Sequence, residues 1–109
     1  MEDRVEISLL MDIYSPLLTE KQKNIMELYY NDDLSLAEIA ELNNTSRQAI
    51  HDLIKRCYKQ ILSYEEKLNL FDKSLKKESV IESVLNDISN KYSIEEKDLQ
   101  EYKNILFDL

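Results

Sequence analysis

Six side chains that could bind an anionic partner lie between positions 47 and 59: Arg47, Gln48, His51, Lys55, Arg56 and Lys59. Arginine and glutamine can read base edges in the major groove, and lysine and arginine bind phosphate. Residues three and four apart share a helix face, so a helix here would present Arg47, Gln48, His51 and Lys55 together. We expect Arg47 and Gln48 to meet base edges, and Arg56 and Lys59 to reach phosphate.

The charge along the chain supports this choice of segment. Residues 43–77 hold 8 basic and 4 acidic groups, a balance of +4, whereas the chain as a whole has a net charge of −8. Residues 1–42 hold 3 basic and 10 acidic groups, and residues 78–109 hold 3 and 8. An anionic partner would therefore dock on 43–77, although Asp52 and the acidic ends would repel a polyanion. Duplex DNA, structured RNA, a protein contact by the same face, or a merely solvent-exposed face all remain open.

Catalysis has little support in the residue types present. The chain has one histidine, one cysteine and no glycine, which excludes glycine-rich phosphate loops, internal disulfides and Cys/His zinc clusters. His51 and Asp52 are adjacent, so on a helix they point about 100° apart and do not form a base and its orienting acid. We therefore expect a protein that is not an enzyme and has no catalytic residue, cofactor or metal.

The N-terminus and the hydropathy pattern predict where the protein resides. No basic stretch leads into an apolar run, and no segment approaches the roughly 18 apolar residues of a membrane span. We expect a cytoplasmic protein with no membrane insertion.

The candidate binding residues lie on the second helix of a predicted helix-turn-helix, between positions 36 and 55. Ala40 is the small residue that lets the two helices cross closely, and Ile39, Ile50 and Leu53 supply the packing between them. Asn44 occupies the turn position usually held by glycine, where it tolerates a positive φ. An unrelated helical hairpin is the competing interpretation.

The rest of the chain predicts an all-α fold of six helices. Capping boxes begin helices at Thr19 with Gln22, at Ser35 with Glu38, and at Ser93 with Glu96. Apolar residues recur with helical spacing over about 3–14, 19–30, 35–42, 46–71, 74–90 and from 93 to the end. We expect one helix-turn-helix domain over 1–72 that includes the long helix, and a helical extension over 73–109.

The long helix carries a heptad seam that predicts a dimer. Apolar residues follow one another at alternating steps of four and three from Ile50 to Phe71. The distal half of this helix needs cover, either from residues 74–109 folded back or from a second chain. We expect a homodimer through the C-terminal helices and four seam residues: Ile61, Tyr64, Leu68 and Phe71.

Several blocks in order resemble the YlxM-type family of bacterial helix-turn-helix proteins: LTEKQ (18–22), LYY (28–30), DLSLAEIAE (33–41), SRQAIHD (46–52), IKR (54–56), YE (64–65) and KL (67–68). The resemblance implies a small cytosolic regulator that acts with the GTPase of the signal recognition particle and with its RNA. The helix-turn-helix alone is also similar to the fourth region of sigma factors, where residues placed like Arg47, Gln48 and His51 face the major groove.

Two functions stay open on this basis. One is an accessory protein of the signal recognition particle, and the other is a helix-turn-helix regulator that binds duplex DNA. We favour the first, because the acidic balance argues against a free-standing DNA binder.

Overall fold

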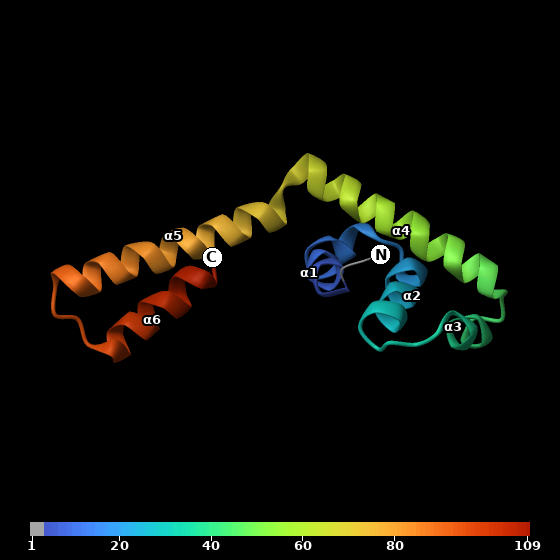
Figure 1. Ribbon diagram of the computed structural model, residues 1–109, viewed down its shortest axis with the longest axis horizontal. Helices are drawn as coiled ribbons and strands as arrows, with labels where there is room; N and C mark the ends of the chain where they lie inside the picture. Colours follow the sequence, from blue (N-terminus) through green and yellow to red (C-terminus); the bar gives the residue numbers. More distant parts are fainter. Residues whose placement is uncertain (1–3) are drawn as a thin grey trace. The chain divides into compact units, whose positions relative to one another are not determined.

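The computed structural model describes residues 4–109, and helices are the only regular secondary structure over that range (Figure 1). The elements are α1 (Arg4–Tyr14), a 3₁₀ turn η1 (Ser15–Leu17), α2 (Glu20–Tyr30), α3 (Leu36–Leu42), α4 (Arg47–Leu68), α5 (Leu70–Lys91) and α6 (Glu96–Phe107). The predicted all-α fold with six α-helices is confirmed. The chain forms two compact units, the first ending at Phe71 and the second running from Asp72 to Leu109.

Two of the three predicted capping boxes are present. The Thr19 hydroxyl accepts from the Gln22 amide at 3.1 Å, and the Gln22 side chain accepts from the Thr19 amide at 3.0 Å. Ser35 and Glu38 form the same pair of bonds, both at 3.1 Å. The hydrogen bond from the Ser35 amide lowers the pKa of the Glu38 carboxyl.

The third box, Ser93 with Glu96, is wrong. The amide of Ile94 donates to the carbonyl of Tyr92, which makes a tight turn there, and the N-cap of α6 is Glu95. No side chain caps α6. Ser93 lies two residues too early for its hydroxyl to reach the first amides of that helix.

Three Asp and Asn residues adopt the left-handed conformation that glycine usually provides. Asp33, Asn44 and Asn69 have φ values of 57°, 51° and 54°. Asn69 also corrects the predicted helix over 46–71, because α4 ends at Leu68 and a left-handed residue cannot continue an α-helix. Phe71 therefore belongs to α5, which begins four residues before the expected start at position 74.

The first unit has a core made from one face of each of its four helices. α4 packs against α1, α2 and α3. The buried side chains come from all four: Ile7, Leu10, Met11, Tyr14, Ile25, Met26, Tyr30, Ile39, Ala40, Ile50, Ile54, Cys57 and Ile61. The apolar stripes that the sequence shows on separate helices thus meet in a single cluster.

The core also shows what covers the seam of α4, and it corrects the predicted dimer contact. Ile61 is 0% exposed inside the cluster that includes the α1 residues. The Tyr64 ring lies 5.9 Å from that of Tyr14, and Phe71 packs against the same cluster. Of the four seam residues, only Leu68, at 44% exposed, keeps substantial apolar surface in contact with solvent. The seam is therefore mainly covered by the chain's own α1.

Hydrogen bonds from α1 and α4 hold the start of α5. The Tyr14 hydroxyl donates to Glu65 Oε1 at 2.6 Å and accepts from the Leu70 amide at 3.3 Å. Glu65 Oε1 also accepts from the Phe71 amide at 3.0 Å. We call these four residues the Tyr14–Glu65 junction. It satisfies two of the amides that every helix leaves unpaired in its first turn.

Alkaline pH should destabilise the first unit. Burial raises the pKa of the Cys57 thiol above its ordinary 9.0 and the pKa of Tyr14 above 10.0, and it raises the pKa of Tyr30 to about 12. The folded state therefore keeps protons that the unfolded state releases. The resulting stability is fully present below about pH 9 and is lost as pH rises through the folded pKa values.

Urea denaturation followed by circular dichroism at increasing pH checks this prediction. The midpoint should fall steadily from about pH 9 to pH 12, and Cys57→Ala should delay its onset. A midpoint that stays constant across that range would contradict the prediction.

The second unit is an antiparallel hairpin of α5 and α6 (Figure 1). The Lys77 ammonium donates to the carbonyl of Leu109 at 2.9 Å, and Lys103 lies 4.0 Å from Glu82. Leu85 is buried, and the other apolar side chains between the two helices are half-buried: Ile81, Ile88, Leu99 and Leu106.

Candidate nucleic-acid interface

α3 and α4 form the predicted helix-turn-helix. Ile39, Ala40 and Ile50 are 0%, 4% and 1% exposed where the two helices pack, and Leu53 is half-buried against the same cluster. Asn44 turns the chain at φ 51°, as its position in the sequence predicts. This packing rules out an unrelated hairpin.

Hydrogen bonds fix the turn between the two helices. The Thr45 amide donates to the Ala40 carbonyl at 3.0 Å, and the Asn43 side chain donates to the Ile39 carbonyl at 2.8 Å. Ser46 then caps α4, its hydroxyl accepting from the Ala49 amide at 3.1 Å. The first turn of α4 has no acidic residue, so the positive end of the helix dipole adds to the charge of Arg47.

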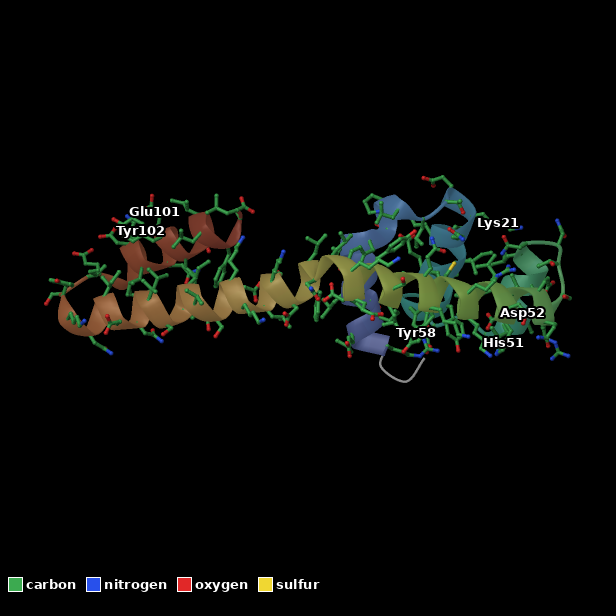
Figure 2. The ribbon with its side chains drawn as sticks, turned by 90° about the horizontal axis from the view of Figure 1, so that it is seen from above. Lys21, His51, Asp52, Tyr58, Glu101 and Tyr102 are labelled. Carbon is green, nitrogen blue, oxygen red and sulfur yellow. The ribbon has the colours of Figure 1, made fainter. Side chains whose placement is uncertain are left out.

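The six predicted binding residues do not share one line along α4: Gln48, His51, Lys55 and Lys59 lie on the side away from the buried Ile50, Ile54 and Cys57, and Arg47 and Arg56 flank them on either side. Five of them are exposed, and His51 is half-buried. Figure 2 shows His51 and Asp52 near the N-terminal end of α4 and Tyr58 farther along the same helix. The six residues form a broad accessible surface centred on Gln48, His51, Lys55 and Lys59, which we call the α4 outer face.

An open hollow lies where the α4 outer face meets the start of α3. It has a volume of about 430 Å³ and is lined by Leu36, Arg47, Gln48 and His51. Leu36 is not among the six residues predicted for the site. Its position in the first turn of α3 predicts only an apolar side chain that faces inward. Spacing does not show that α3 approaches Arg47, because this depends on how the two helices cross.

Asp52 is partly compensated within the α4 outer face. The Gln48 amide donates to Asp52 Oδ1 at 2.9 Å, one turn along the helix. His51 Nδ1 lies 3.6 Å from the same oxygen, which is too far for a hydrogen bond. Nδ1 is buried although 42% of the side chain is exposed, so the exposed part of the ring lies away from Asp52.

Metal-ligating residues and the cysteine are the other residue types that could support chemistry. No group of three or more His, Cys, Asp or Glu within 4–109 could hold a metal ion. Cys57 is buried, and burial raises the pKa of its thiol, which disfavours the nucleophilic thiolate. No helix in this part of the chain is long and apolar enough to cross a membrane.

Comparison with known proteins identifies relatives along almost the whole chain. A family model described as "Putative helix-turn-helix protein, YlxM / p13 like" matches residues 1–105. A UPF0122 protein of Clostridium botulinum (strain Alaska E43 / Type E3) is 66% identical over 109 residues, 100% of each chain.

Two further relatives extend the match. A UPF0122 protein of Clostridium novyi (strain NT) is 55% identical over 112 residues, which cover 100% of this chain and 93% of the relative. A UPF0122 protein of Clostridium perfringens (strain SM101 / Type A) is 58% identical over 102 residues, 94% of this chain and 90% of the relative. With the helix-turn-helix seen in the first unit, these matches show that the chain belongs to the UPF0122 family of YlxM / p13-like proteins.

Proposed function

We propose that this protein is a non-enzymatic regulator that binds nucleic acid through the α4 outer face. One observation carries the proposal. The most basic segment of an acidic chain, with a balance of +4 over residues 43–77, includes the exposed side of the second helix of a helix-turn-helix. Counterion release from phosphates would supply most of the affinity, and the hollow beside Arg47 would receive a base edge or backbone.

The finer proposal is an accessory factor of the signal recognition particle that acts in the cytoplasm. Its support is the resemblance of residues 18–68 to the YlxM-type family, together with the acidic charge of residues 1–42 and 78–109. Such a factor would bind the particle's RNA, contact its GTPase, or both. A protein that is acidic outside one basic face is better suited to a structured partner that contacts only this face than to unselective binding along duplex DNA.

Duplex DNA is the second candidate ligand, and one observation favours it. Arg47 and Gln48 lie at the N-terminal end of α4, the part of a recognition helix that contacts base edges. Leu36 borders the same hollow and would offer an apolar contact to a thymine methyl group.

The double variant Arg47→Ala, Lys55→Ala should lose this binding without unfolding. We expect Kd for the particle RNA to rise at least about tenfold, and the log–log salt slope to fall by about two units, because two charge contacts to the nucleic acid disappear. Fluorescence anisotropy over a salt series measures both quantities.

The matched control, Lys21→Ala with Lys97→Ala, removes the same charge from exposed positions on α2 and α6. It should keep most of the affinity, and both double variants should have unchanged thermal unfolding. Figure 2 marks Lys21 on α2. If the folded Arg47→Ala, Lys55→Ala variant bound the RNA as tightly as the unmodified protein, the interface would lie elsewhere.

Competition separates the two ligands. An accessory factor should show no strong preference among duplex DNA sequences, whereas a transcriptional regulator should prefer one duplex over random duplex by at least about a thousandfold. Selection from a random duplex library that returns one tight site would contradict the accessory role and support the regulator.

A further inference from the structure

The helices of the second unit cover little apolar surface by packing on each other. Leu85, at 7% exposed, is the one side chain between Asp72 and Leu109 that is buried. A pair of helices needs a larger shared core to be stable in water, since most helical stability in proteins comes from packing an apolar face. This unit therefore needs a further apolar neighbour.

An exposed apolar strip along the hairpin shows where that neighbour would bind. Val80 and Val84 on α5 are 60% and 49% exposed. Tyr102, Ile105 and Leu109, on α6 and at its end, are 48%, 57% and 86% exposed. Within each group the residues are spaced three or four apart, so each group lines one side of its helix. We call these five residues the hairpin strip.

The two halves of the hairpin strip lie on the same side of the hairpin. On α5 and on α6, the strip residues are rotated about the helix axis by about 100° from the residues that face the other helix. The direction of this rotation is the same on both helices. Because α5 and α6 are antiparallel, equal rotations bring both halves to one side. Lys77 meets Leu109 next to the strip at 2.9 Å, whereas the Glu82–Lys103 pair lies at the opposite side.

The two edges of the hairpin strip carry opposite charge. The edge on α6 is net acidic, with Asp98, Glu101 and Asp108 against Lys97. The edge on α5 is weakly basic, with Lys73, Lys76 and Lys91 against Asp72 and Asp87. Two of these lysines also pair with aspartates four residues earlier, Lys76 with Asp72 at 3.0 Å and Lys91 with Asp87 at 3.1 Å.

We propose that the hairpin strip binds the same strip of a second copy of this chain. A twofold axis parallel to the helices would place α5 of one copy against α6 of the other, so that each basic edge meets an acidic edge. The four helices would then form a bundle around the two strips. This surface replaces the seam of α4 as the dimer contact, and it does not depend on what the α4 outer face binds.

Sedimentation equilibrium of the full chain at micromolar concentration tests the proposal. The unmodified protein should have twice its chain mass of 13.0 kDa. The double variant Val84→Glu, Ile105→Glu should dissociate, with Kd raised at least about a hundredfold, while the first unit keeps its thermal transition because neither side chain belongs to that unit. The control Leu75→Glu, at 50% exposed on the other side of α5, should remain a dimer.

Charge exchange tests the pairing of α5 with α6. Lys76→Glu with Lys91→Glu, and separately Asp98→Lys with Glu101→Lys, should each weaken the dimer at least about tenfold. An equimolar mixture of the two variants should restore it, because every edge then meets an opposite charge.

Three results would overturn the proposal. The first is an unmodified chain that is monomeric, which would mean that the strip is covered within one chain or by another partner. The second is a Val84→Glu, Ile105→Glu variant that stays dimeric. The third is a pair of edge variants that each dimerise as well as the unmodified chain.

Discussion

Ile50→Asp should unfold the first unit. The Ile50 side chain is 1% exposed between α3 and α4, in contact with the cluster that also holds Ile39 and Ala40. A carboxylate there would be buried without a partner, which costs several kcal/mol, and a small domain has only about 5–15 kcal/mol of stability in total. Circular dichroism at 222 nm should show the loss of most helical signal from α1 to α4, and thermal unfolding should lose its cooperative transition.

Ala49→Asp is the matched control because it introduces the same charge one residue earlier. Ala49 is exposed in the first turn of α4, where a carboxylate interacts favourably with the helix dipole. The control should unfold at the temperature of the unmodified protein or slightly above. Equal loss of structure in both variants would mean that α3 and α4 do not pack as described.

Tyr14→Ala should have the second largest effect. The ring is 1% exposed, and its removal should cost about 3–5 kcal/mol through lost burial and the cavity that remains. Tyr14→Phe keeps the ring and removes only the hydroxyl that donates to Glu65 at 2.6 Å. Because Glu65 is an acceptor that carries charge, we expect this second variant to cost about 1–3 kcal/mol.

Hydrogen exchange separates the two contributions at Tyr14. In Tyr14→Phe the amide of Leu70 loses its acceptor, so its exchange should accelerate more than that of amides in the middle of α4. Urea denaturation gives the total cost for each variant. If Leu70 exchanged as slowly in Tyr14→Phe as in the unmodified protein, the hydroxyl would have no role in holding the start of α5.

Local signals in the sequence were sufficient to predict the helix-turn-helix. The capping box at Ser35 and the asparagine at position 44 are signals that involve only a few neighbouring residues. In the structure the box caps α3 and Asn44 has the expected positive φ. The six residues of the α4 outer face follow from helical spacing alone once α4 is identified. Leu36 does not, because its place in the site depends on the packing of α3 against α4.

The seam shows what local signals leave open. The heptad spacing continues through Leu68 to Phe71, so periodicity gives no sign that α4 ends at Leu68. In a chain without glycine, an asparagine is the residue best able to take a left-handed turn, and that chemistry was the available signal. The cover that α1 gives to Ile61 was not predictable from spacing, because it is a tertiary contact between distant segments.

The contact between Tyr14 and Glu65 also sets an order of events during folding. These residues are 51 positions apart, whereas α3 and α4 are joined by a turn of a few residues. Closing the short loop costs less entropy, so the helix-turn-helix can form before α1 joins it. On the ribosome α1 is made before α4, so the part of α1 that packs on α4 stays uncovered until the distal part of α4 has emerged, although α2 can contact α1 earlier. α1 is thus synthesised before α3 and α4 but completes its native contacts after them.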